Sequence, residues 1–206
     1  MVSAFVTGFI LGISLIGAIG AQNTFVLRQG IVGRHVFYVA LFCSISDALL
    51  ITIGVSGISF FLSNYITDLS QWLLGFSAIW LFGYGLLRLR AAFKAETSIE
   101  TQMTSSEGLL QTLSIIAVLT FANPHVYLDT MILIGSLSQQ FSGENKIAFT
   151  AGASTASFIF FFSLAYGAKL LKPLMERPSS WRILDFIIAI IMFSIAIKLS
   201  LEANWY

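Results

Sequence analysis

Long apolar stretches, separated by short polar clusters, make up most of this chain. A helix needs about 20 mainly apolar residues to cross a bilayer, and each of these stretches is close to that length or exceeds it. They are Val2–Gly20 with a continuation to Gly30, Val36–Leu62, Leu69–Leu87, Leu110–Ser136, Ile147–Ala168 and Trp181–Leu201. The pattern predicts an all-α polytopic membrane protein with about six transmembrane helices.

The composition agrees with a chain that lies mainly in lipid. Of the 206 residues, 57% are hydrophobic and 10% are charged, and the mean hydropathy is +0.87. Basic residues are too few for a nucleic-acid surface. One cysteine, Cys43, excludes an internal disulfide and a thiolate metal cluster, and two histidines make a catalytic zinc site unexpected. We therefore expect no metal and no cofactor.

The basic residues are concentrated in three of the predicted connections. By the positive-inside rule these three connections are cytoplasmic, which places both termini outside. A competing topology makes the first segment re-entrant, with five crossings and an inside N-terminus. The basic residues concerned are Arg28, Arg34, Arg88, Arg90, Lys94, Lys169, Lys172, Arg177 and Arg182.

A polar cluster at Thr120–Thr130 interrupts the fourth apolar stretch. Asn followed by Pro is a helix-start signal, so Asn123-Pro124 predicts a new helix within the span. In that helix His125 and Asp129 lie four residues apart on one face. Asn123, Tyr127 and Thr130 form a neighbouring stripe. Polar groups this deep in a bilayer are costly unless they serve a function.

The first apolar stretch is also overlong, and the polar pair Gln22-Asn23 predicts a break at Asn23. Asn23 and Asn123 are 100 residues apart, and each interrupts the first segment of a three-span unit. An odd number of spans inverts the second unit, as in many secondary transporters. We expect a first three-helix repeat at 1–94, a cytoplasmic loop at 95–108 and a second, inverted repeat at 109–206.

Asp47 lies about eleven residues inside the second span, too deep to reach an interface. With Asp129 it is a candidate for binding a cation. An intramembrane enzyme with an Asp47/Asp129 carboxylate dyad is the alternative, although the Gly-x-Gly-Asp context of intramembrane aspartyl proteases is absent. Helix packing is the default expectation for the small residues of the fifth span, with Ser154 and Ser157 as the alternative candidates for a cavity wall. A surface pair is expected for Asp185 with Arg182, and a helix-end pair for Lys198 with Glu202.

Three runs together resemble the lysine/arginine exporter family, and specifically its arginine-exporter branch. They are Gly20–Gly30, Ser46-Asp47 and Asn123–Thr130. The similarity covers nearly the whole chain in length and span order, with one departure: members often have proline where this chain has Ala21. The resemblance implies a multi-pass protein of the bacterial inner membrane that exports basic L-amino acids and uses the proton motive force.

A cationic amino acid suits the candidate site. Asp47 and Asp129 are expected to bind its guanidinium or ammonium group. Its α-carboxylate is expected at a half-helix N-terminus, at Asn23 or Asn123. His125 either orients Asp129 and relays a proton, or is an ordinary buried histidine. The expected polar wall comprises Gln22, Ser46 and Tyr127. Arginine, lysine, another amino acid and an inorganic cation all remain open as substrates, and the oligomeric state is not predicted.

Overall fold

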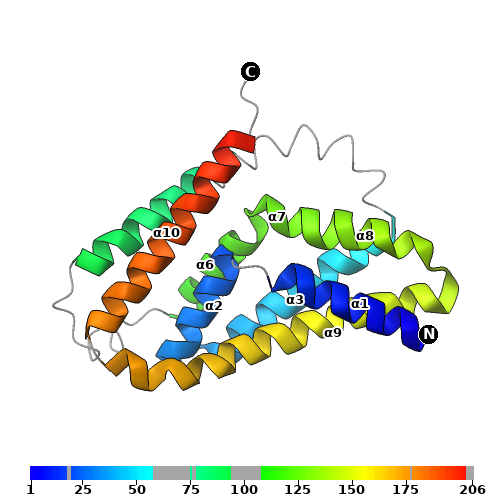
Figure 1. Ribbon diagram of the computed structural model, residues 1–206, viewed down its shortest axis with the longest axis horizontal. Coiled ribbons are helices and arrows are strands. Elements are labelled where there is room, and N and C mark those ends of the chain that lie inside the picture. Colours follow the sequence, from blue (N-terminus) through cyan, green and yellow to red (C-terminus); the bar gives the residue numbers. More distant parts are fainter. Residues whose placement is uncertain (18–19, 58–74, 76–77, 94–107, 177, 203–206) are drawn as a thin grey trace.

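The computed structural model describes residues 1–17, 20–57, 75, 78–93, 108–176 and 178–202. Within these ranges the chain is helical apart from short connections, and it contains no β-strand (Figure 1). The elements are α1 (Val2–Ile16), α2 (Ala21–Val32), α3 (Val36–Val55), a helix at 78–93, α6 (Leu109–Phe121), α7 (Pro124–Tyr127), the π-helix η1 (Leu128–Leu133), α8 (Ile134–Leu137), the 3₁₀-helix η2 (Ser138–Gln140), α9 (Gly143–Gly167), the 3₁₀-helix η3 (Ala168–Glu176) and α10 (Pro178–Glu202).

Among the described residues, three helical stretches are long and apolar enough to cross a membrane. These are Val36–Val55, Gly143–Leu171 and Ser179–Lys198. The α1–α2 pair adds a fourth if it counts as one span, although it is bent by 84°. The prediction of an all-α protein with several membrane-crossing helices is confirmed.

The first apolar stretch breaks earlier than predicted. α1 ends at Ile16 and α2 begins at Ala21, so Asn23 lies in the first turn of α2 rather than at the break. The Asn23 amide nitrogen donates a 2.9 Å hydrogen bond to the carbonyl of Ile16, the last residue of α1. A proline at position 21 would lack a backbone N–H, but Ala21 is an ordinary first helical residue. The asparagine therefore satisfies a carbonyl that the break leaves free, instead of causing the break.

The second interrupted segment breaks where the sequence predicts. α6 ends at Phe121 and α7 begins at Pro124, which confirms the helix start at this proline. Beyond Tyr127 the helix widens into η1 before it returns to α-helical geometry in α8. Asp129 lies in this π-helix, where the regular four-residue spacing assumed from the sequence no longer applies. Short π-helical segments of this kind are frequent at functional sites.

Helices from the first and second halves of the chain pack against each other. α1 runs along α9, and α3 packs against both α9 and the η1–α8 helix (Figure 1). Glycines at these contacts allow the backbones to approach closely. A Cβ atom at Gly54 of α3 would lie 2.6 Å from the Cα atom of Met131, and one at Gly8 of α1 would overlap the carbonyl of Phe149.

Other predicted boundaries change or fall outside the described residues. α3 ends at Val55, before the predicted Leu62, and Gly57 adopts the left-handed φ of +85° that terminates helices. Arg88 does not begin a loop, because the helix continues to residue 93. Residues 58–74, 76–77 and 94–107 are not described, and they include much of the predicted third span and nearly all of the loop expected at 95–108.

Candidate functional site

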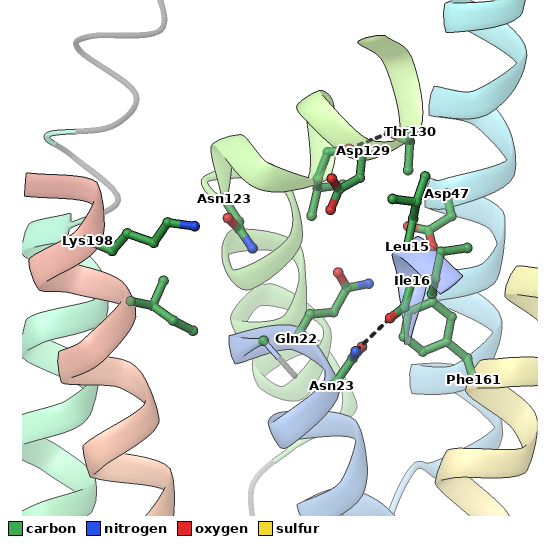
Figure 2. Close-up of a pocket in the computed structure, with 13 residues that line it drawn as sticks. Leu15, Ile16, Gln22, Asn23, Asp47, Asn123, Asp129, Thr130, Phe161 and Lys198 are labelled. Carbon is green, nitrogen blue, oxygen red and sulfur yellow. Dashed lines mark hydrogen bonds between the residues drawn. The ribbon is translucent and has the colours of Figure 1, made fainter. Parts of the chain in front are cut away.

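A cavity of about 320 Å³ opens between α2, α3, α10 and the broken α6–α7 segment (Figure 2). This volume is at the low end of the roughly 300–1,000 Å³ range of small-molecule sites. The apolar side chains on its wall include Leu15, Ile16, Val126, Phe161 and Ile195. Its polar and charged side chains are Gln22, Asn23, Asp47, Asn123, Asp129, Thr130 and Lys198. Most of the predicted site residues therefore share one cavity.

Asp47 and Asp129 approach this cavity from different helices. Asp47 belongs to α3 and is only 3% exposed, whereas Asp129 belongs to η1 and is partly buried. The close contact of Gly54 with the η1 backbone brings these two helices together. Figure 2 shows both carboxylates on the same side of the cavity. The fold thus gathers two acids that are far apart in the sequence.

Asp47 has a hydrogen-bond partner in Ser157, a residue for which the sequence left both helix packing and a place on the cavity wall open. The Ser157 hydroxyl, fully buried on α9, donates a 3.0 Å hydrogen bond to Oδ2 of Asp47. Ser157 follows Ala153 and Ala156 on a face of small residues, so the backbones of α3 and α9 can approach closely. A serine on a close-packed helix face was the only sequence signal for this role.

The amide side chains lie at the two breaks. Gln22 and Asn23 reach the wall from the start of α2, and Asn123 reaches it from the gap between α6 and α7. Gln22 is 6% exposed and contributes a side-chain amide, which carries both donors and an acceptor, to the wall of the cavity.

Two predicted residues, Tyr127 and Ser46, do not line the cavity, and a third, His125, has a side chain that the structure does not describe. Tyr127 donates a 2.8 Å hydrogen bond to the carbonyl of Phe121 at the end of α6, so its hydroxyl closes the helix end. Ser46 is buried but does not line the cavity. The His125 side chain lies outside the described part of the structure, so its predicted role stays a prediction.

Lys198 is the cavity residue that the sequence interpretation missed. It extends from α10 toward Asn123 and lines the cavity together with Ile195, three residues earlier on the same helix (Figure 2). The expected pair with Glu202 falls on a side chain that is not described. The sequence did offer one signal for this position: Lys198 stands at the end of an otherwise apolar span, and residues three or four positions away on a helix share its face.

Asp185 is not the surface residue that the sequence suggested. It is 1% exposed, and its Oδ1 atom lies 3.9 Å from Nε of Arg28 and 3.6 Å from a terminal nitrogen of Arg88. Arg88 also stacks on the ring of Tyr84, 4.8 Å from the ring centre. These charges join α2, α10 and the helix at 78–93, away from the cavity lining. The expected surface pairing with Arg182 is therefore replaced by a buried network.

Within the described residues, no group of three or more His, Cys, Asp or Glu side chains is placed to hold a metal ion. Among the described lining residues, the charged groups are the carboxylates of Asp47 and Asp129 and the ammonium of Lys198. Such a wall is able to bind an organic ion through hydrogen bonds and charge.

Comparison with known proteins decides the family. The model of the LysE type translocator family matches residues 13–203. The chain belongs to the LysE type translocator family. The Arginine exporter protein ArgO of Pectobacterium carotovorum is 36% identical over 201 residues, which cover 97% of this chain and 98% of the relative. No solved structure matches the chain.

Other relatives carry the same name. The Arginine exporter protein ArgO of Photorhabdus laumondii is 39% identical over 202 residues, or 97% of this chain and 96% of that protein. The protein of that name from Salmonella typhimurium is 34% identical over 206 residues, or 98% and 95%. This LysE-family protein is therefore a multi-pass membrane transporter and not an enzyme, which removes the carboxylate-dyad alternative.

Proposed function

We propose that this LysE-family protein exports basic amino acids, and arginine in particular, across the bacterial inner membrane. The observation that carries the proposal is the presence of Asp47 and Asp129 on one cavity, each from a different part of the chain. Relatives named as arginine exporters over nearly their full length support the choice of substrate.

The chemistry of the cavity supports a substrate with two cationic groups. A carboxylate binds a guanidinium through two parallel charge-assisted hydrogen bonds and binds an ammonium through one. Asp47 is held by Ser157, so its carboxylate is oriented before a substrate arrives. A neutral amino acid brings only one cationic group to a wall that carries two carboxylates, so it would gain fewer charge-assisted hydrogen bonds than arginine or lysine.

The site lies at the centre of two inverted three-helix repeats, residues 1–94 and 109–206, joined by a cytoplasmic loop at 95–108. Reciprocal packing supports this arrangement. The bent first segment of the first repeat, through α1, packs on α9, while the broken first segment of the second, through η1 and α8, packs on α3. In inverted-repeat transporters the substrate binds where such interrupted helices meet.

Export is coupled to proton entry. Moving a cation out of a cell that is negative inside costs about 2.3 kcal/mol per charge per 100 mV, so an inward charge must compensate. Protons and the cationic substrate compete for the carboxylates of Asp47 and Asp129. Binding of one releases the other, and the result is antiport.

Purified protein in liposomes tests the proposal. Vesicles loaded with radiolabelled arginine should lose it faster than protein-free vesicles, and an acidic exterior should accelerate the loss. Unlabelled lysine, leucine and potassium chloride inside the vesicles then rank the substrates by competition. If vesicles with protein retain as much arginine as protein-free vesicles, arginine export is refuted. If the rate of arginine efflux depends on neither a pH gradient nor a membrane potential, the protein is a uniporter. That result would refute antiport but not arginine export.

A further inference from the structure

The cavity holds a third charged residue, Lys198, for which arginine export by two carboxylates gives no role. Lys198 is the last residue of the apolar span Ser179–Lys198. Its side chain reaches from α10 toward Asn123, across the cavity from the two carboxylates (Figure 2). Lys198 is exposed at the end of its span, where a lysine can direct its ammonium group into a polar cavity and keep it out of the lipid.

The charges on the wall mirror those of a basic amino acid. Among the described lining residues, Asp47 and Asp129 are acidic and Lys198 is basic. Arginine and lysine each carry two cationic groups and one carboxylate. The wall therefore supplies one opposite charge for every charge on such a substrate, and the net charges of site and substrate cancel.

The placement of these groups also matches the shape of the substrate. The α-carboxylate and the side-chain cation lie at opposite ends of a basic amino acid. In the cavity, the carboxylates of Asp47 and Asp129 lie together on the α3–η1 side, and Lys198 lies on the α10 side (Figure 2). Gln22 also lines the cavity, and its side-chain amide carries N–H donors of the kind that bind an anion.

We propose that Lys198 binds the α-carboxylate of the substrate and thereby makes the site selective for amino acids over other organic cations. This inference rests on the proposed export of basic amino acids. It assigns the carboxylate to a side chain of α10 rather than to a helix start at Asn23 or Asn123. Lys198 also repels a cation that carries no carboxylate, so it acts against the wrong ligand as well as for the right one.

Agmatine tests this assignment because it is arginine without the carboxylate and keeps both cationic groups. Wild-type protein in liposomes should take up radiolabelled arginine in exchange for internal arginine, and agmatine should compete poorly. In Lys198→Met, the arginine concentration for half-maximal exchange should rise roughly tenfold or more, the usual cost of a lost charge-assisted hydrogen bond. Agmatine should compete as well as in the wild type or better.

Two further variants serve as controls. Lys198→Arg keeps the positive charge and should restore the preference for arginine over agmatine. Lys146→Met removes a half-buried lysine that contacts Gln139, outside the cavity lining, and should behave as wild type.

Several results would overturn the assignment. One is wild-type protein that binds agmatine as tightly as arginine, a measurement that needs no variant. Another is Lys198→Met with unchanged half-maximal concentrations, and a third is an equal loss for both ligands, which would indicate a general structural role. Wild-type liposomes that exchange no arginine would instead refute the proposed function, so the two failures are distinct.

Discussion

The hydroxyl of Ser157 on α9 donates a hydrogen bond to the carboxylate of Asp47 on α3, at 3.0 Å and across 110 residues of sequence. Both residues are buried where the two helices pack together. Asp47 also lines the cavity, so this contact connects helix packing directly to the candidate site.

Ser157→Ala should weaken substrate binding without preventing folding. The change leaves a buried carboxylate with one donor fewer, at a cost of about 1–3 kcal/mol. Asp47 then loses its fixed orientation, and we expect the arginine concentration for half-maximal exchange in liposomes to rise roughly three- to tenfold. Ser163→Ala changes an exposed serine on the same helix and should have no effect. An unchanged half-maximal concentration in Ser157→Ala would show that the hydrogen bond is dispensable.

Asp47→Asn and Asp129→Asn should each reduce arginine efflux to the level of empty liposomes. Each variant loses a charge-assisted hydrogen bond worth about 1.5–3 kcal/mol, together with the group that exchanges a proton for the substrate. Membrane insertion should persist, because removing a buried charge relieves desolvation. Glu144→Gln, an exposed acid in the first turn of α9, is the matched control. Normal efflux by either cavity variant would exclude that carboxylate from the site.

Gly54→Ala should destabilise the protein because the added methyl group would lie 2.6 Å from backbone atoms of Met131. Overpacking of this kind costs about 1–3 kcal/mol, and here it also forces α3 away from η1. We expect a lower melting temperature in detergent and weaker arginine exchange, since Asp47 and Asp129 move apart. Gly83→Ala has no atom within 4 Å of its new methyl group and should melt as wild type. Equal melting temperatures for the two variants would contradict the close approach of α3 and η1.

Asp185→Asn should destabilise the contact between α2, α10 and the helix at 78–93. Removing one partner from a buried ion pair costs roughly 3–5 kcal/mol, and the separations of 3.6 Å and 3.9 Å favour the lower end of that range. In Asp185→Asn/Arg88→Met the loss should be smaller than the sum of the single losses, because the two residues interact. Thermal unfolding in detergent measures all three, with exposed Arg90→Met as control. Strictly additive losses would argue against the network.

The loop expected at 95–108 should be cytoplasmic. In a Cys43→Ser background, a Ser98→Cys variant should react with a membrane-impermeant maleimide only after the membrane is permeabilised. Arg88, Arg90 and Lys94 precede this position, and basic residues are retained on the cytoplasmic side. If the maleimide labels this cysteine in intact spheroplasts, the loop is periplasmic and the proposed topology is wrong.

Features that depend only on residues adjacent in the sequence were predictable from the sequence. Proline has no N–H to donate and a fixed φ, so Pro124 begins a helix whatever surrounds it, and the structure confirms this start. The length and apolarity of the stretches around Val36, Ile147 and Trp181 likewise predicted spans that the structure contains. In the first stretch the local signal was weaker, because Ala21 can continue or start a helix. The break there lies before Asn23 instead of at it.

Partners across the fold were decided by tertiary structure alone. Ser157 belongs to a stripe of small residues that packing alone would explain, and only the approach of α9 to α3 places its hydroxyl on Asp47. Asp185 fits a surface pair by its spacing, but the packing of α10 buries it between Arg28 and Arg88. Spacing within α10 likewise does not reveal that Lys198 lines the cavity. Helical periodicity determines which residues share a face, whereas the neighbour that covers the face depends on how the helices assemble.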